Sequence, residues 1–419
     1  MVVIMSKISK DLKTFKEYLE IEDYIEDDEI ENYNLELLID KMHIAILYLE
    51  DERHDSYTLH SLNDILITTI LALFSNCNTF VEIHLFAEKH YKWLKKYLNF
   101  YYGLPSISTF KRVISIINPK ELEEMCNKVF FSFVKLTQPI FKKGNIQIND
   151  IYTMDGKVAK ASKRNTYNED IKSMNAMSVY SIKYEKCLMT EFIGEKTNEI
   201  PTAPELLLQL NLKNVAITFD ALNTQEKTIE TIANAGGFYV APIKDNHSNL
   251  YEDLIEYFNN EKMLKDVKKY ELEQTEKSHN QVETRKYIFT NDINWIYQKE
   301  KWKKIKSIGV VIKKIDGKEV EKRYFISNIE SNNIEIIGQI IRKEWSIENK
   351  LHWYLDMVFE EDKNKCYIEN SQKNLNIIRK FCLGVLKIVK EQYKKSMNLI
   401  RLQISMDFEN EIEQLLKLL

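Results

Sequence analysis

The first apolar residues along the chain recur with the spacing of an amphipathic helix. They are Leu35, Leu38, Ile39, Met42, Ile46 and Leu49. This i, i+3, i+4, i+7 pattern predicts a helix that follows the acidic run Glu22–Glu29. The helical pattern then continues from Leu59 to Leu136, so we expect a helical N-terminal region.

A break in this helical region precedes a basic segment. Pro105, Ser106 and Ser108 stand before Lys111 and Arg112, and either serine could cap a helix that carries the two basic residues. Such a helix could read DNA, or it could be an ordinary solvent-exposed face. The sequence leaves both interpretations open.

From residue 148 the pattern changes to short apolar runs that alternate with helical segments. The predicted strands are Ile148–Met154, Ala176–Tyr184, Leu188–Gly194, Val215–Phe219 and Phe238–Ile243. Helices are expected at Pro201–Leu210 and Thr224–Ala235. Strands that alternate with helices indicate an α/β core with some parallel pairing.

An irregular block follows, over residues 246–333. We expect a helix at Leu250–Phe258 and a hairpin whose strands, Ser307–Ile315 and Lys318–Ile329, flank Asp316-Gly317. An Asp-Gly pair between two such runs is a strong hairpin signal, so the block is interpreted as a β-rich insertion. The helical pattern returns over Ile334–Val358 and Leu375–Tyr393.

Two aspartates, Asp155 and Asp220, stand where predicted strands end. Ligands of open α/β sheets gather at the carboxyl ends of strands, so these residues are candidate cation ligands. Either one taken alone would more often cap the next turn or helix. Both together favour the metal interpretation.

A third candidate is a polar stripe on the predicted helix over 334–358. Its members, four residues apart, are Glu344, Glu348, His352 and Asp356. Trp345, Leu351, Trp353 and Leu355 flank the stripe, so we expect it to face a cleft or a packed surface. Carboxylates gathered in a cleft are best neutralised by a divalent metal such as Mg²⁺.

The charge of the chain depends on where it is divided. With 59 basic and 63 acidic residues the net charge is −4, which taken whole argues against nucleic acid as a partner. Residues 1–50 hold 5 basic and 13 acidic side chains, so residues 51–419 carry +4. Residues 301–350 alone hold 12 basic and 7 acidic side chains, so the charge does not exclude DNA.

The cysteines and the apolar runs indicate a soluble cytoplasmic protein. None of the 5 cysteines forms a CxxC pair, which excludes a cysteine zinc site and a disulfide framework. The most apolar stretch, Ile65–Phe74, is shorter than the ~20 residues that span a bilayer. No apolar signal segment precedes it, so no membrane partner is expected.

Six short segments in a fixed order resemble one known family. They are Gly103–Ser106 with Thr109–Arg112, Asp155-Gly156-Lys157 with Lys160, Lys196–Leu207, Asp220–Gln225, Glu283-Thr284-Arg285, and Trp345–Trp353. Each is weak alone, but in this order they are specific. From about Asp51 to its C-terminus the chain resembles the H-repeat-associated (ISAs-type) transposases, a branch of the insertion-sequence DDE transposases.

The resemblance implies a fold and a division into domains. We expect an α/β, RNase H-like catalytic core at 146–419, with the β-rich insertion at about 246–333. A helical accessory domain at 51–145, a candidate for DNA binding, would precede it, and 1–50 would form an acidic leader with an amphipathic helix.

The resemblance also implies a reaction and its residues. The family's DDE triad carries over to Asp155, Asp220 and Glu348, as catalytic residues and as ligands of two Mg²⁺ ions, with Mn²⁺ as a substitute. These ions would drive cleavage at transposon ends and joining to target DNA, by attack of water and then of a 3′-hydroxyl.

The implied partner is double-stranded DNA, both the terminal inverted repeats and the target. A homodimer on the DNA is expected by analogy, as is association with the nucleoid. Nine residues in or beside the motifs are candidates for contacting DNA: Lys111, Arg112, Lys157, Lys160, Lys244, Arg285, Arg342, Lys350 and His352.

The chain departs from the family at several positions. Glu344 replaces a usual His, Asn280-Gln281 replaces Gly-Arg, Glu360 and Tyr367 stand where relatives carry Arg, and Asn175 stands where His is frequent. A degenerate relative that binds DNA without catalysis is therefore the alternative function. A carboxylate-bridged metal enzyme built on the Glu344–Asp356 stripe is disfavoured, because no second helix offers matching ligands.

Overall fold

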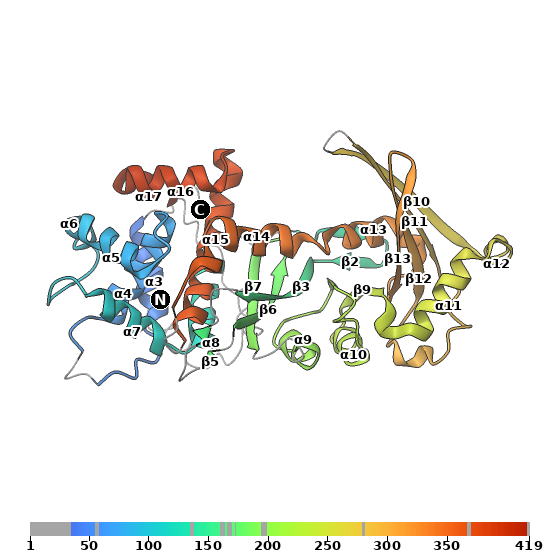
Figure 1. Cartoon of the computed structure of the whole chain (residues 1–419), viewed down its shortest axis with the longest axis horizontal. Coiled ribbons are helices and arrows are strands. Elements are labelled where there is room, and N and C mark those ends of the chain that lie inside the picture. The colour runs from blue at the N-terminus through green and yellow to red at the C-terminus, as the bar shows by residue number, and fades with distance from the viewer. Residues whose placement is uncertain are drawn as a thin grey trace.

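The fold is described from a computed structural model. It describes residues 35–54, 58–134, 138–159, 164–165, 170–171, 173–193, 199–278, 281–366 and 370–416. The acidic run Glu22–Glu29, Lys160, Asn280 and Tyr367 lie outside these residues. The molecule is elongated, with helices at one end, a sheet in the middle and a β-ribbon region at the other end (Figure 1).

The N-terminal region is helical, as predicted. Its helices are α3 (Leu35–Ile46), α4 (Leu62–Phe74), α5 (Phe80–Lys89), α6 (Tyr91–Leu94), α7 (Ile107–Ile116) and α8 (Pro119–Phe131). The apolar face of α3, including Leu38, Ile39 and Met42, is fully buried. Ser106 caps α7, because its hydroxyl accepts a hydrogen bond from the Thr109 amide at 3.2 Å.

The C-terminal helices α16 (Met397–Met406) and α17 (Phe408–Leu416) join this helical end (Figure 1). Phe408 packs edge-on against Phe86 of α5 and against Trp93 of α6, with ring centroids 4.8 Å apart in each pair. The buried Arg401 donates hydrogen bonds to the carbonyl of Leu73, at 2.7 Å, and to the side chain of Asn78. The two ends of the described chain therefore share one helical layer.

A nine-stranded mixed sheet runs from the centre of the molecule to the end opposite the helices (Figure 1), with the order β10-β11-β12-β13-β9-β8-β3-β6-β7. The five strands of this sheet that come first in the sequence are β3 (Asp150–Ala159), β6 (Met174–Ser181), β7 (Lys186–Ile193), β8 (Val215–Phe219) and β9 (Phe238–Ile243). The pairs β3–β8 and β8–β9 are parallel, whereas the pairs β3–β6 and β6–β7 are antiparallel. Short pairs form between β1 (Phe141–Lys143) and β2 (Ile146–Ile148), and between β4 (Arg164–Asn165) and β5 (Asp170–Ile171). The mixed α/β class is confirmed.

The β-rich block predicted at 246–333 extends this sheet rather than standing apart from it. After α11 (Ser248–Asn259) and α12 (Glu261–Lys265), the chain forms β10 (Lys269–Ser278), β11 (Gln281–Thr290), β12 (Ser307–Ile315) and β13 (Lys318–Ser327). β13 pairs with β9, from Tyr324↔Ile243 to Ser327↔Val240. Asp316 and Gly317 both have positive φ, 48° and 79°, as the predicted two-residue hairpin turn requires.

Helices cover both faces of the sheet (Figure 1). α9 (Glu199–Leu207) and α10 (Glu226–Asn234) lie on one face, and α13 (Ile334–Lys343) and α15 (Ser371–Tyr393) lie on the other. Isoleucines of α13 pack on Ile151, Ala216 and Val240 of the central strands. In the described part of the chain, no helix has both the length and the apolarity that crossing a membrane would require.

The helix predicted over Ile334–Val358 is interrupted. α13 ends at Lys343, and a π-helical turn, η8 (Glu348–His352), precedes α14 (Trp353–Met357). The turn is identified by the hydrogen bond from the Trp353 amide to the Glu348 carbonyl, which spans five residues. The prediction of one continuous α-helix over this segment was wrong. The π turn holds one more residue than an α-helical turn, so every side chain after it is rotated around the helix axis relative to the expected position.

Candidate active site

Asp155 and Asp220 lie on neighbouring parallel strands. The β3–β8 ladder ends at the pair Met154↔Phe219, so each aspartate is the residue that directly follows this last pair. Asp220 follows the end of β8, as predicted. Asp155 was expected to end its strand, and this prediction was wrong. β3 continues to pair with β6 as far as Ala159.

The glycine after Asp155 is explained by close packing. A Cβ atom at Gly156 would lie 2.6 Å from Oε1 of Glu199, and such a contact requires a shift of the backbone or of the carboxylate. Glu199 is itself buried, with its Oε1 3.4 Å from Nδ2 of Asn175. A glycine after Asp155 therefore allows β3 to lie close to the Glu199 carboxylate of α9.

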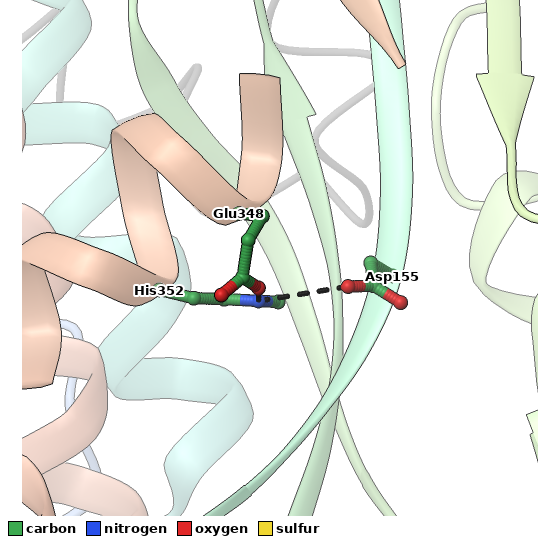
Figure 2. A group of neighbouring side chains, drawn as sticks. All are labelled: Asp155, Glu348 and His352. Carbon is green, nitrogen blue, oxygen red and sulfur yellow. Dashed lines mark hydrogen bonds and ion pairs between the residues drawn. The ribbon is translucent and has the colours of Figure 1, made fainter. Parts of the chain in front are cut away.

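Glu348 and His352 reach Asp155 from the π turn. His352 is 3% exposed, and its Nδ1 lies 3.0 Å from Oε2 of Glu348 and 3.6 Å from Oδ2 of Asp155. Figure 2 shows the imidazole beneath the Glu348 carboxylate, with Asp155 facing it from β3. One donor atom from each of the three side chains lies within 4.8 Å of the others.

Asp220 is held beside this cluster rather than within it. Its Oδ1 accepts hydrogen bonds from the backbone amide of Asn223, at 3.1 Å, and from Asn223 Nδ2, at 2.9 Å. It is close enough to Asp155 to act on that carboxyl electrostatically. Asp155 is therefore near both Asp220 and the Glu348–His352 pair.

The pKa values of Asp155 and Glu348 are shifted in opposite directions. Burial raises the pKa of Asp155 to about 6, the His352 imidazole opposes this rise, and Asp220 and Glu348 add to it. The hydrogen bond between Glu348 and His352 lowers the pKa of the more exposed Glu348 carboxyl group. A divalent ion would relieve the repulsion that Asp155 experiences from both neighbours, so this donor set fits a metal.

The polar stripe predicted on one helix is divided among three sites. The Glu344 carboxylate accepts two hydrogen bonds from Arg323 Nη2, at 2.6 and 2.7 Å. Asp356 accepts a hydrogen bond from Lys157 at 2.6 Å, and only Glu348 and His352 join Asp155. The flanking Leu351 and Leu355 are buried, whereas Trp345 and Trp353 are exposed.

Several basic residues expected at DNA are paired with carboxylates. The Lys157 ammonium is surrounded by Asp356, Glu361 at 3.5 Å and Asp362 at 3.9 Å, and its side chain is 11% exposed. Lys350 forms an ion pair with Glu185.

Arg285 and Arg342 share one pair of carboxylates. Arg342 lies 2.6 Å from Glu276 and 3.8 Å from Glu283. Arg285 forms an ion pair with Glu283 and lies 3.9 Å from Glu276. The two arginines therefore form a network on β10, β11 and α13.

The remaining candidates for contacting DNA have different surroundings. Lys244 is exposed at the end of β9, close enough to Glu344 to act on its carboxyl group. Lys111 and Arg112 lie on α7 in the helical layer, with Arg112 exposed. His352 lies in the Asp155 cluster, and Lys160 is outside the described residues.

Sequence reasoning did not identify two residues that support the site. Glu361, 3% exposed, holds Lys157 and accepts a hydrogen bond from Asn376 at 2.5 Å. Lys387, on α15, donates a hydrogen bond to the Lys350 carbonyl of the π turn at 2.7 Å. A lysine within an otherwise apolar helical pattern was the available signal for Lys387, and for Glu361 we find none.

Comparisons with known proteins identify the family. Residues 146–384 match the family described as "Transposase DDE domain", and residues 45–129 match the one described as "DDE_Tnp_1-associated". The chain is 29% identical over 374 residues to the "H repeat-associated putative transposase YhhI" of Escherichia coli, covering 85% of this chain and 93% of that protein.

Two other proteins complete the comparison. The chain is 31% identical over 248 residues to the "H repeat-associated putative transposase YbfD" of Escherichia coli, covering 59% of this chain and 92% of that one. A solved structure of piggyBac transposase in a synaptic complex with hairpin DNA aligns with a TM-score of 0.37 and 10% identity, over 96% of this chain and 80% of that one. The family match and the two relatives confirm the resemblance drawn from the motifs, and the chain belongs to the transposase DDE domain family.

Proposed function

We propose that this protein is the DNA transposase of an insertion sequence, which cleaves the element's ends and joins them to target DNA. The observation that carries the proposal is the convergence of Asp155, Glu348 and His352 beside Asp220. Asp155, Asp220 and Glu348 are the proposed catalytic carboxylates and metal ligands. The strands β7-β6-β3-β8-β9, with helices on both faces, support an RNase H-like core.

Two divalent ions, Mg²⁺ or Mn²⁺ in its place, would activate the attacking water or 3′-hydroxyl and stabilise the leaving oxygen. Asp155 would hold metal together with Asp220 and Glu348, both of which are close enough to act on its carboxyl group electrostatically. The Asn223 amide and side chain fix the Asp220 carboxylate. His352 Nδ1 lies 3.0 Å from Oε2 of Glu348 and helps to position that carboxylate.

Double-stranded DNA is the proposed partner, with a homodimer as the active assembly. The domains we propose are an accessory domain over 51–145, a catalytic domain over 146–419 with its insertion at about 246–333, and a leader over 1–50. Exposed basic residues outside the cluster, Arg112 and Lys244, remain candidates for contacting phosphates. A cytoplasmic location with association to the nucleoid follows from this function.

A degenerate relative that binds DNA without catalysis is the second candidate. It is favoured by the pairing of Lys157, Arg285, Arg342 and Lys350 with carboxylates, because a neutralised cation attracts phosphate weakly. The matched relatives include the "Inactive transposase YbfQ" of Escherichia coli, 38% identical over 73 residues. The intact carboxylates favour the active form.

Cleavage of the element's own ends tests the proposal. Duplexes that carry the terminal inverted repeats from the DNA flanking the gene should be nicked and joined by the purified protein with Mg²⁺. Asp155→Asn should abolish both steps, while Asp253→Asn, at an exposed position on α11, should leave them unchanged. Cleavage that persists in Asp155→Asn would refute the assigned role, and a wild-type protein that binds these duplexes without cutting them would favour the second candidate.

A further inference from the structure

The donor atoms gathered around Asp155 include a nitrogen. Within the described residues, the side chains that converge are Asp155, Glu348 and His352, whereas the acidic triad expected from the motifs contains oxygen donors alone. Nδ1 of His352 is 3.0 Å from one carboxylate and 3.6 Å from the other. Ligands on adjacent corners of an octahedron with bonds of ~2.1 Å lie about 3.0 Å apart, so these separations suit one shared ion.

The surroundings of His352 argue against a role in contacting DNA and leave the two carboxylates as its ionic partners. The side chain is 4% exposed, so it is not available to grip DNA from solvent. The nearby Lys157 is held by three other carboxylates. In the part of the chain that the structure describes, His352 is the one side chain that forms an ion pair with Asp155 or Glu348.

The far nitrogen of the ring is placed to carry the proton. Nε2 of His352 is buried without a hydrogen-bond partner among the described residues. It belongs to a pocket that is also lined by Glu361 and Asn376, each of which has a buried oxygen lacking a hydrogen bond. A histidine that binds a metal through one nitrogen carries its proton on the other, where an acceptor holds it.

The π turn brings both residues to Asp155 together. Glu348 and His352 are its first and last residues, and the Lys387 ammonium holds its Lys350 carbonyl at 2.7 Å. The backbone of the π turn therefore sets the positions of both residues relative to Asp155. Single π turns inside helices occur frequently at functional sites.

We propose that His352 is a metal ligand through Nδ1, and that the Asp155–Glu348–His352 site takes a first-row transition ion in preference to Mg²⁺. Imidazole nitrogen binds transition ions well, whereas Mg²⁺ selects oxygen donors. The inference rests on the proposed function only in that the same two carboxylates hold the metal. It adds a ligand that the acidic triad does not include, and a class of ion that this ligand selects.

Metal binding by the full-length protein tests the inference without an activity assay. Mn²⁺ is titrated and followed by electron paramagnetic resonance, with Co²⁺ and Mg²⁺ as competitors. Spin-echo modulation of the bound Mn²⁺ should show coupling to an imidazole nitrogen. His352→Ala should abolish this coupling and weaken Co²⁺ binding about tenfold or more, with an effect on Mg²⁺ below about threefold.

Two further variants make the result specific. His352→Asn places an amide near the position of Nδ1, so it should retain Mg²⁺ binding while the nitrogen coupling and the preference for Co²⁺ are lost. His84→Ala is the matched control, because Nδ1 of His84 lies 3.6 Å from Glu88 in the same i, i+4 arrangement on α5, where the described residues place no third ligand. It should leave all three affinities unchanged.

The outcomes separate this inference from the proposed function. Bound Mn²⁺ without nitrogen coupling, together with an unchanged Co²⁺ affinity in His352→Ala, overturns the role of His352 and leaves the transposase proposal intact. Nitrogen coupling in a protein that cannot cut inverted-repeat DNA overturns the transposase proposal and supports the ligand. A wild-type protein that binds none of the three ions overturns both the ligand and the expected cofactor.

Discussion

The Nζ atom of Lys387, on α15, lies 2.7 Å from the carbonyl oxygen of Lys350, inside the π turn that carries Glu348 and His352. Lys387 also contacts the Tyr180 hydroxyl at 2.5 Å and the Glu185 carbonyl at 3.2 Å. All three partners are uncharged, and burial lowers the pKa of the Lys387 amine well below its ordinary value. A buried side chain thus fixes the backbone that presents the candidate ligands.

Lys387→Met should therefore loosen the π turn. Removal of the ammonium deletes its hydrogen bonds to the Lys350 carbonyl, the Tyr180 hydroxyl and the Glu185 carbonyl. This loss should lower the free energy of unfolding by about 1–3 kcal/mol. Loss of an outer-shell support of this kind should also weaken metal binding by about tenfold. Urea denaturation and Mn²⁺ titration measure the two effects.

Lys390→Met is the control, because this neighbour on α15 donates to the Tyr354 hydroxyl at 2.8 Å rather than to the π turn. It should have a smaller effect on stability and none on metal affinity. A Lys387→Met protein that binds metal as the wild type does would remove the lysine from the support of the site.

Lys157 should act through stability rather than through DNA contact. Its ammonium joins β3 to α14 and to the carboxylates of Glu361 and Asp362. Lys157→Met leaves the 3%-exposed Glu361 without its cation, so we expect it to destabilise the fold by about 3–5 kcal/mol. Asp356, with a 33%-exposed side chain, should matter less, at about 1 kcal/mol for Asp356→Asn.

A double variant separates these effects. Lys157→Met with Glu361→Gln should recover part of the lost stability, because the double variant no longer buries the Glu361 carboxylate without Lys157. Thermal or urea unfolding of the four proteins measures the coupling. Additive losses in the double variant would argue that Lys157 and Glu361 do not interact.

Local signals predicted much of the fold. The boundaries expected for Val215–Phe219, Phe238–Ile243 and Ser307–Ile315 agree with the strands observed. The Asp316-Gly317 turn was predicted because two adjacent residues with positive φ require such residue types. Asp155, Asp220 and Glu348 were predicted from motifs, and the parallel pairing of β3 with β8 accounts for the proximity of the two aspartates.

Features set by distant contacts were not predicted. The pairing of β13 with β9, which makes the insertion part of the main sheet, depends on residues about 85 positions apart and has no local signal. Lys157 resembled a phosphate ligand because its partners, Asp356 and Glu361, lie about 200 residues further on. No residue type in the sequence marks the π turn, so the segment was predicted as an ordinary α-helix from its apolar spacing.

Metal affinity should fall as the pH is lowered through about 6. Asp155 must lose its proton to bind metal, and burial raises the pKa of its carboxyl group to about 6. The protonated form therefore dominates below this value, and affinity at pH 5 should be about tenfold lower than at pH 7. Glu348, whose pKa is lowered, stays ionised over this range.

Mn²⁺ titration at pH 5, 6 and 7 measures the effect. The same titrations of His352→Asn are made without the imidazole. A decrease in metal affinity that remains in this variant is therefore due to protonation of the Asp155 carboxylate. An affinity that is constant from pH 7 to pH 5 in both proteins would contradict the role of Asp155 as a ligand.

Removal of the acidic leader should strengthen non-specific DNA binding. Residues 1–34 hold 4 basic and 10 acidic side chains, a net charge of −6, so their deletion changes the chain from −4 to +2. The deletion stops before α3, because Leu38, Ile39 and Met42 are buried in the helical layer and a cut at residue 50 would expose that core.

Less repulsion of phosphate should tighten binding at low salt, and the difference should vanish at high salt, where exposed charges are screened. Fluorescence anisotropy with a random-sequence duplex, at about 50 mM and at 500 mM salt, measures both. An affinity at low salt equal to that of the full chain would exclude the leader from DNA binding.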